Sequence, residues 1–311
     1  MITAPRDDPH FLKDIEIGLG AWQWGDRIMW GYGRGYGDED VRAAFETSLE
    51  RGVNFIDTAE IYGNGRSERL LGEFSRLARC PVRIATKYFP WPWRLDGTSV
   101  KRALRGSLSR IGIQAVDLYQ IHWPTPLLNI ENAMREMAEL VHLGMVRAVG
   151  VSNFGAADMQ KAAAALDRRG LRLASNQVHY SLLNRSIEHS GVVTAAQRLG
   201  VRLIAHSPLE RGLLSGKYGP RHPPPGIRRG QYLTMLPRVG TLLEVMAKVG
   251  RAHGGKSHSQ VALNWLICKG VLPIPGAKSG PQAEENAGAI GWRLTDKEVG
   301  LLDVASGPIE R

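Results

Sequence analysis

The feature that most constrains the fold of this chain is a regular alternation of short apolar runs with amphipathic stretches. Near-continuous apolar runs of this length are typical of parallel strands that are covered on both faces. Eight such runs follow one another: DIEIGLGAW (14–22), VNFIDT (53–58), VRIATK (82–87), VDLYQIH (116–122), VRAVGVS (146–152), LASNQV (173–178), VRLIAHS (201–207) and VLPIPG (271–276).

The stretches between these runs have the apolar spacing of helices, and several of them end in glycine, as helices often do. Eight strand–helix units favour an α/β fold of the (β/α)8 TIM barrel type over a doubly wound sheet, and we expect extra C-terminal helices. Five of the predicted helices are DVRAAFETSLERG (40–52), SERLLGEFSRL (67–77), SVKRALRGSLSRIG (99–112), ENAMREMAELVHLG (131–144) and ADMQKAAAALDRRG (157–170).

The organisation predicted for the 311 residues is a single barrel domain over 1–311, because no linker divides the chain and barrels of this size are common. One irregular insert, YGPRHPPPGIRRGQY (218–232), follows the seventh run. Long loops of this kind are usually functional or mobile.

Composition narrows the class of protein. Two cysteines, Cys80 and Cys268, do not make a disulfide framework, so we expect a reducing, cytoplasmic location. The first residues, MITAPRDDPHFLKD, lack the apolar segment of a signal peptide, and no apolar run approaches the roughly 18 residues of a membrane span. The net charge of +10 comes from Lys and Arg spread along the chain, which favours an anionic small molecule over nucleic acid as the partner.

Common catalytic and nucleotide-binding motifs are missing from the sequence. The glycine-rich run GYGRGYG (31–37) does not fit the dinucleotide fingerprint, and we interpret it as a flexible loop. The chain has no Walker A motif, no G-x-S-x-G and no Cys/His cluster with zinc spacing, so we expect no metal.

Polar residues stand at the ends of the predicted strands, where barrels of this type build their active sites. Asp57 ends the second run with Tyr62 just beyond it, Lys87 ends the third, and His122 ends the fourth. Each of these residues alone has an ordinary structural explanation, such as capping a turn or forming a solvated strand tip. Together, on three adjacent strands, they indicate a site.

The chemistry that suits these four residues is delivery of a proton. A phenol with a pKa of about 10 is a poor acid at neutral pH unless its ionised form is stabilised, and a nearby ammonium lowers its pKa. Lys87 would be that ammonium, and Asp57 would hold it in place. His122 would donate a hydrogen bond to a carbonyl oxygen that Tyr62 protonates. No covalent nucleophile is present, and a reductant is still needed.

Seven blocks resemble, in the same order, those of the aldo-keto reductase family: FIDTAEIYG, IATK, DLYQIHWP, GMVRAVGVSNF, SNQVHYSLL, SPLERGLLSGKY and PIPGAKSGPQAEENAGAI. The resemblance runs from about Gly18 to Val299. It implies a barrel enzyme that binds NADPH and reduces an aldehyde or ketone, with a tetrad of Asp57, Tyr62, Lys87 and His122. The blocks GAWQWGD, PWR, HPPPGIRRGQY and AIGWRLTDKEV look most like plant and cyanobacterial members, whose substrates are poorly defined.

The resemblance also implies a set of cofactor-binding residues. A strand, then PGAKS, then a helix aims backbone N–H groups and a cation at a phosphate, so Lys278 with Ser279 favours NADPH over NADH. The alternative is a solvated loop cation beside a serine cap. The nicotinamide residues implied are Ser152, Asn153 and Gln177, those near the pyrophosphate are Ser207, Leu209 and Gly212, and those at the adenosine end are Gly276, Lys278, Ser279, Gln282, Glu285 and Asn286.

Two further features bear on the cofactor. His206 stands where the family usually has an aromatic ring that stacks on the nicotinamide. Imidazole can be charged near neutral pH, so we expect affinity for the cofactor, and for NADP+ in particular, to fall as the pH drops toward 6. Arg228 and Arg229, in the insert, would close over the pyrophosphate or belong to a solvated loop.

Tryptophans on expected strand ends or nearby loops predict an aromatic-lined mouth, although core and loop packing would explain each one singly. This mouth would suit an aromatic or bulky carbonyl better than a small sugar. The tryptophans are Trp22, Trp24, Trp91, Trp93 and Trp123.

Two alternatives to a reductase stay open. One is a cofactor-sensing regulatory subunit like those of potassium channels, which retain the tetrad; the absence of a long N-terminal extension disfavours it. The other is a cofactor-binding protein with little turnover, suggested by His206. The sequence predicts a small-molecule carbonyl substrate and leaves the oligomeric state unknown.

Overall fold

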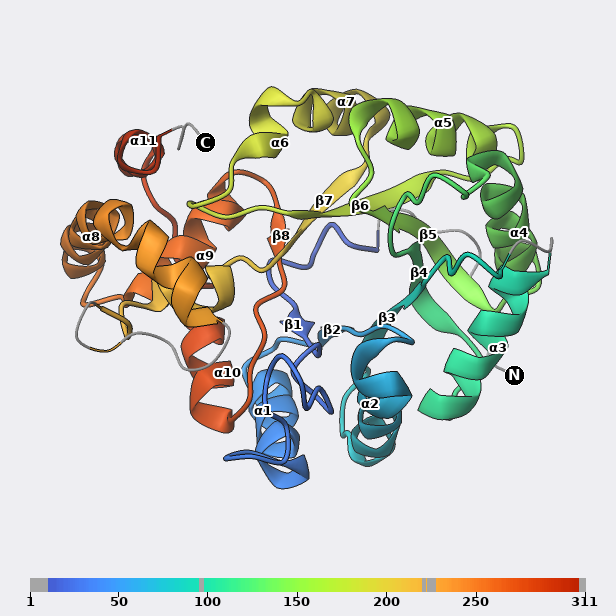
Figure 1. Ribbon diagram of the computed structural model, residues 1–311, viewed down its shortest axis with the longest axis horizontal. Helices are drawn as coiled ribbons and strands as arrows, with labels where there is room; N and C mark the ends of the chain where they lie inside the picture. The colour runs from blue at the N-terminus through green and yellow to red at the C-terminus, as the bar shows by residue number, and fades with distance from the viewer. Residues whose placement is uncertain (1–10, 95–97, 220–221, 223–227, 308–311) are drawn as a thin grey trace.

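The strands of the chain form one parallel sheet that curls into a barrel (Figure 1). The computed structural model describes residues 11–94, 98–219, 222 and 228–307, and only the backbone of 228–238. Within these residues, eight strands pair in sequence order: β1 (Leu19–Gly20), β2 (Phe55–Asp57), β3 (Arg83–Tyr88), β4 (Val116–Ile121), β5 (Val146–Ser152), β6 (Leu173–His179), β7 (Arg202–His206) and β8 (Leu272–Pro273). Gly20 bridges Gly276 in parallel, which joins the two edges of the sheet. The predicted barrel class is confirmed.

Helices surround the strands on the outside, as Figure 1 shows. Two follow the last strand, as expected. The helices are α1 (Asp38–Glu50), α2 (Arg66–Leu77), α3 (Ser99–Ile111), α4 (Ile130–His142), α5 (Ala156–Asp167), α6 (Ser186–His189), α7 (Val192–Leu199), α8 (Arg228–Ala252), α9 (His258–Cys268), α10 (Gly280–Ala287) and α11 (Asp296–Ala305), with 3-10 turns η1 (Tyr62–Gly65) and η2 (Glu210–Ser215).

Local sequence explains where individual helices begin and which face they bury. Asn129 caps α4, since its side chain accepts a hydrogen bond from the Asn132 amide at 3.0 Å. The buried side of the same helix carries Met134, Met137 and Val141 at helical spacing. The helix therefore has both a defined start and a face that packs against the sheet.

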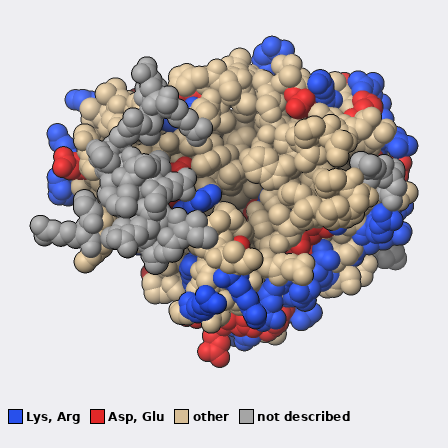
Figure 2. Space-filling view, in the orientation of Figure 1, with Lys and Arg blue, Asp and Glu red and all other residues tan. Residues whose placement is uncertain are grey.

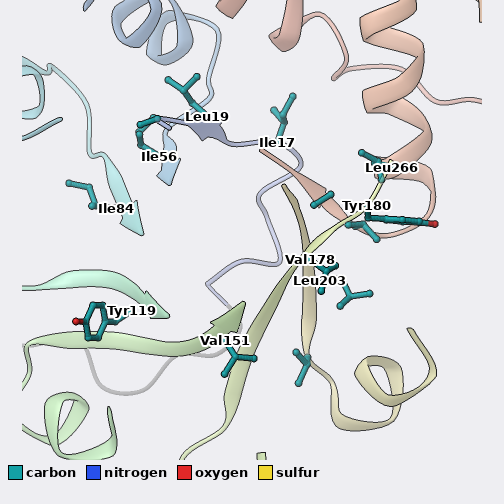
Figure 3. Close-up of a cluster of buried hydrophobic side chains, with 14 of the residues drawn as sticks. Ile17, Leu19, Ile56, Ile84, Tyr119, Val151, Val178, Tyr180, Leu203 and Leu266 are labelled. Carbon is teal, nitrogen blue, oxygen red and sulfur yellow. The ribbon is translucent and has the colours of Figure 1, made fainter. Parts of the chain in front are cut away.

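The core has two layers because the strands are buried on both faces. Outside the sheet, Ile56, Ile84 and Tyr119 belong to the cluster between strands and helices (Figure 3). Inside the barrel, a separate cluster fills the interior with alternate residues of successive strands: Phe55, Ala85, Leu118, Ala148, Ala174, Ile204 and Leu272. The continuous apolar runs of the sequence follow from this double burial.

The interior layer also positions the polar residues. Side chains two residues apart in a strand share a face. Asp57 therefore lies above Phe55 and Lys87 above Ala85, one step nearer the carboxyl ends of the strands. The polar side chains at the strand ends therefore cover the apolar interior of the barrel on this side.

Some boundaries differ from the prediction. The first run, 14–22, forms a strand only at 19–20, and the last, 271–276, only at 272–273. Pro273 and Pro275 have no N–H to donate, which limits the last ladder. α8 begins at Arg228, so the irregular insert ends earlier than 232.

The described part of the insert is small, because 220–221 and 223–227 lie outside the described residues, as do the side chains of Arg228 and Arg229. Within the described residues, no helix is both long and apolar enough to cross a membrane. On the face seen in Figure 2, Lys and Arg are spread around the edge and mixed with Asp and Glu.

Candidate active site

A cavity of about 1110 Å³ opens where the strands end. It brings together residues that are far apart in the sequence, including most of those predicted for the site. The predicted residues that line it are Trp22, Asp57, Tyr62, His122, Trp123, Ser152, Asn153, Gln177, His206, Ser207, Leu209, Gly212, Gly276, Lys278, Gln282, Glu285 and Asn286.

Lys87 is the most deeply buried member of the predicted tetrad, with none of its surface exposed. Its Nζ forms an ion pair with Asp57, donates to the Thr58 carbonyl oxygen at 2.8 Å and lies 3.4 Å from the Tyr62 hydroxyl. A buried charge is costly unless it is paired and hydrogen-bonded. The ammonium is therefore fixed directly beneath the phenol.

The second oxygen of Asp57 is also satisfied. Asp57 Oδ2 accepts hydrogen bonds from Gln120 Nε2 at 3.1 Å and from Gln177 Nε2 at 2.9 Å. Residues of three strands thus hold one carboxylate. This network orients the acid toward Lys87.

The pKa values of the pair show which effect dominates. Burial opposes the charge on Lys87, but Asp57 and Tyr62 outweigh burial and raise its pKa. Burial raises the pKa of Tyr62, although the charge of Lys87 works in the opposite direction. The expected net lowering of the phenol pKa is therefore wrong, because burial exceeds the effect of the ammonium. At neutral pH, Tyr62 holds its proton and Lys87 its charge.

The loop after β2 sets the position of Tyr62. Tyr62 begins η1, in which Gly63 has a φ of 54°. A Cβ on Gly63 would lie 2.7 Å from the backbone carbon of Gly25, so only glycine fits this close approach. The turn therefore packs tightly against the loop between β1 and α1.

His122 contributes a neutral ring to the cavity wall. Its backbone N–H donates to the Tyr88 carbonyl oxygen at 2.9 Å, and its ring meets that of Tyr62 edge-on at 5.7 Å. Burial, with smaller effects of Lys87 and His206, places its pKa well below 6.5. Its Nδ1 has no hydrogen-bond partner among the described residues. The ring is neutral at physiological pH.

Asn153 links His122 to the next strands. Its Nδ2 donates to the His122 carbonyl oxygen at 3.2 Å and to Ser152 Oγ at 2.9 Å. Its Oδ1 lies 2.9 Å from His206 Nε2, and since an amide oxygen only accepts, the imidazole proton is on Nε2. These groups form a continuous polar wall across β4, β5 and β7.

The charge state of His206 differs from the one predicted from the sequence. Burial, with smaller effects of His179, Lys87 and Arg211, lowers its pKa to about 3. A charged His206 near pH 6 is therefore contradicted, and the expected fall in cofactor affinity loses its physical basis. The ring stacks on that of His179, with centroids 5.3 Å apart and planes at 17°.

His179 was not selected from the sequence. It also lines the cavity, and its Nε2 lies 2.5 Å from Glu210 Oε1. The signal that would have identified it is its position two residues after Gln177, which places both side chains on one face of β6.

The loop between β8 and α10 forms the far end of the cavity. The Lys278 amide donates to Gln282 Oε1 at 2.9 Å, and Asn286 Nδ2 donates to the Gly276 carbonyl oxygen at 3.3 Å. A Cβ on Gly276 would lie 2.0 Å from Gln23 Nε2, so a larger residue there would displace the Gln23 amide. Ser279 stands at the N-cap of α10 and does not line the cavity.

The five tryptophans predicted for the pocket divide into three groups: two line the cavity, one is in the core, and two stack on each other away from the cavity. Trp22 and Trp123 line the cavity, and the Trp22 ring stacks on Tyr62 with centroids 6.2 Å apart. Trp24 is fully buried, where it packs against Phe45 and Phe74, so the structure contradicts its prediction as a pocket residue.

Trp91 and Trp93 stack on each other, with centroids 4.9 Å apart. Trp93 is 73% exposed, and neither ring lines the cavity, which contradicts their prediction as pocket residues. Trp30 lines the cavity but was not predicted as a pocket residue, because it is on an irregular loop whose sequence has no periodicity.

Among the described residues, no group of three or more His, Cys, Asp or Glu could hold a metal ion.

Comparison with known proteins adds independent information. Residues 16–306 match the model of the "Aldo/keto reductase family". The chain is 40% identical over 309 residues to a chloroplastic pyridoxal reductase of Arabidopsis thaliana, covering 95% of this chain and 84% of that protein.

Two solved structures share the architecture across the whole chain. The glycerol dehydrogenase of Gluconobacter oxydans is 25% identical, with a TM-score of 0.82 and coverage of 100% of this chain and 98% of that one. An aldo-keto reductase from Klebsiella pneumoniae in complex with NADPH is 27% identical, with a TM-score of 0.75 and the same coverage.

Proposed function

Because the chain belongs to the aldo/keto reductase family, we propose that it reduces an aldehyde or ketone with Tyr62 as the proton donor and NADPH as the cofactor. Carbonyl reduction with NADP(H) is the chemistry of this family. The observation that carries the assignment is the Lys87 Nζ, which lies 3.4 Å from the Tyr62 hydroxyl while it is paired with Asp57.

The proton moves from Tyr62 to the carbonyl oxygen. A raised pKa keeps the proton on the Tyr62 hydroxyl until negative charge develops on the substrate. The Lys87 ammonium then stabilises the phenolate that is left. Asp57 keeps that ammonium charged, and the neutral ring of His122 offers an N–H to the same carbonyl oxygen.

The residues around the cavity suit a dinucleotide. Ser152, Asn153 and Gln177 supply hydroxyl and amide groups at adjacent strand ends, which suits a carboxamide. Lys278 supplies a cation just before α10, where backbone N–H groups also favour an anion. When bound, NADPH supplies the hydride. The family resemblance implies that Ser207, Leu209 and Gly212 lie near the pyrophosphate and His206 beside the nicotinamide, and all four residues line the cavity.

An aromatic aldehyde is the substrate class that we propose. Trp22 stacks beside the proton donor and Trp123 adds a second indole to the wall. Such rings favour a flat, apolar partner. The Arabidopsis thaliana relative is named a pyridoxal reductase, and pyridoxal is an aromatic aldehyde.

The single-domain organisation over 1–311 and the cytoplasmic location stay predictions.

The decisive test is Tyr62→Phe, assayed by NADPH absorbance with pyridoxal and with other aromatic, aliphatic and sugar carbonyls. We expect turnover to fall by roughly 10²–10⁴-fold, because the general acid is lost. Binding of NADP+ should persist. Tyr88→Phe is the matched control, since this phenol is on the same strand as Lys87 but bonds to Ser99. Cofactor binding without turnover of any carbonyl by the wild type would contradict the proposal and favour a sensing role.

The substrate class has its own test. Trp22→Ala should raise KM for aromatic aldehydes several-fold and leave small aliphatic aldehydes nearly unchanged, because stacking contributes about 1 kcal/mol. Trp93→Ala is the control, since this exposed ring does not line the cavity. Equal effects on both substrate classes would rule out an aromatic platform.

A further inference from the structure

The Lys278 ammonium lies between two aromatic rings of the loop that joins β1 to α1 (residues 21–37). Its Nζ is 4.2 Å from the ring centroid of Tyr36 and 5.1 Å from that of Trp30. It also donates a hydrogen bond to the Trp30 carbonyl oxygen at 2.9 Å. Two ring faces and one carbonyl oxygen thus contact a cation that lines the cavity.

The same loop also contacts the backbone just before Lys278. The Trp24 indole N–H donates to the Ala277 carbonyl oxygen at 3.1 Å. The Gln23 side chain lies against Gly276, and its amide would have to shift to admit a Cβ there. The Tyr36 hydroxyl in turn donates to the Gln23 carbonyl oxygen at 2.7 Å. The two loops therefore form one packed unit at this end of the cavity.

These contacts limit the conformations of the Lys278 side chain before a ligand binds. A lysine on an open loop samples many rotamers, and ordering it on binding costs free energy. Attraction between the ammonium and the electron-rich ring faces restricts it before any ligand arrives. The Lys278 backbone N–H donates to Gln282 Oε1 at 2.9 Å, so Lys278 stands just before the first turn of α10, where N–H groups favour an anion.

We propose that Tyr36 and Trp30 are specificity-determining residues, which hold the Lys278 ammonium ready for the 2′-phosphate that distinguishes NADPH from NADH. The inference rests on the proposed function, because it takes the adenosine end of the cofactor to lie at α10. It assigns to the β1–α1 loop a share in cofactor choice. Tyr36 and Trp30 act through Lys278 and are positioning residues.

The test compares Kd values for NADP+ and NAD+, measured by titration calorimetry on the full-length protein. Tyr36→Leu removes the nearer ring. We expect the preference for NADP+ over NAD+ to fall roughly 3- to 10-fold, which is the scale of a cation–π contact. Tyr36→Phe keeps the ring and loses only the hydroxyl, so it should retain nearly the wild-type preference.

Trp30→Leu is the second variant, and it carries the test if Tyr36→Leu does not fold. It keeps the backbone carbonyl that accepts from Lys278 and removes only the more distant ring. A smaller fall in preference is expected, about 2- to 3-fold. Equal losses of affinity for NADP+ and NAD+ would show a purely structural role and overturn the inference. So would a Tyr36→Phe variant as impaired as Tyr36→Leu.

Lys278→Met separates this inference from the function on which it rests. It should lower the preference at least as much as Tyr36→Leu, and adding Tyr36→Leu to it should cause no further fall. If Lys278→Met leaves the preference unchanged, the adenosine-end assignment fails and the inference with it. Carbonyl reduction, tested by Tyr62→Phe, would still stand. A further fall in the double variant would show that Tyr36 acts independently of Lys278.

Discussion

Two lysines belong to the candidate site, and their surroundings differ: Lys278 lines the cavity, whereas Lys87 is buried beneath the cavity wall. Lys87 is inside the barrel with none of its surface exposed, and it pairs with the carboxylate of Asp57. Lys278 is at the rim, partly exposed, between the rings of Tyr36 and Trp30. The contacts of the Lys87 ammonium include a full counter-charge, and those of the Lys278 ammonium include two ring faces and a carbonyl oxygen.

The difference follows from access to water. An ammonium that loses all its hydration needs an opposite charge, because the desolvation cost is several kcal/mol. An ammonium at the rim keeps part of its hydration, and the weaker attraction of ring faces helps to orient it. The buried lysine is therefore suited to stabilising a charge that develops beside it. The rim lysine is suited to meeting an anion from outside.

The largest expected effect on stability comes from breaking the buried ion pair of Asp57 and Lys87. Asp57→Asn leaves the Lys87 ammonium without its counter-charge, so the free energy of unfolding should fall by about 3–5 kcal/mol. Urea denaturation at pH 7 measures it. Asp158→Asn is the control, because its pair with Lys161 is exposed and should contribute under about 1 kcal/mol.

A double variant checks the cause. In Asp57→Asn/Lys87→Met no charge is left unpaired, so most of the lost stability should return. A double variant as unstable as Asp57→Asn alone would mean that the carboxylate matters through Gln120 and Gln177 instead.

The next effect is the pH dependence of stability that His206 causes, which tests whether the site keeps this imidazole neutral. His206 has a pKa of about 3 in the folded protein, whereas an unfolded histidine titrates near 6.5. Between these values the unfolded chain binds a proton that the folded chain does not. Stability therefore falls as the pH drops below about 6.5, and from pH 7 to pH 5 this residue contributes a loss of roughly 2 kcal/mol.

Urea denaturation of wild type and His206→Tyr at both pH values measures that contribution. The variant should lose roughly 2 kcal/mol less than the wild type on acidification. His189→Tyr, at an exposed position, is the matched control. Identical losses in wild type and His206→Tyr would mean that His206 is not held neutral.

A smaller effect is expected at the rim. Lys278→Met should change the free energy of unfolding by less than about 1 kcal/mol, because the ammonium is partly exposed and its interactions are partly screened by water. Urea denaturation beside Asp57→Asn gives the comparison directly. A loss as large as that of Asp57→Asn would show that the two lysines do not differ in the way described.

The smallest expected effect is on the pH dependence of cofactor binding. Because the imidazole of His206 stays neutral, NADP+ affinity should follow parallel curves in wild type and His206→Tyr between pH 8 and pH 6. Calorimetric titration across that range checks it. Curves that diverge as the pH falls would indicate that a charged imidazole faces the cofactor.

Strand periodicity explains why much of the architecture was predictable. The eight apolar runs and the strand-end positions of Asp57, Lys87 and His122 depend on local spacing, which the sequence displays. Loops carry no such spacing. Trp24 and Trp30 stand six residues apart in the same loop, yet one is in the core and the other lines the cavity.

By itself, the sequence determined the barrel class and the polar residues gathered at the strand ends. Alternation along a strand is a local property, and every parallel strand of a barrel ends at the same face. Only the tertiary structure decided that His206 stays neutral, that burial raises the pKa of Tyr62, and that Lys278 meets rings about 240 residues away in the chain. Burial and contacts between distant segments exist only once the chain is folded, so no local pattern encodes them.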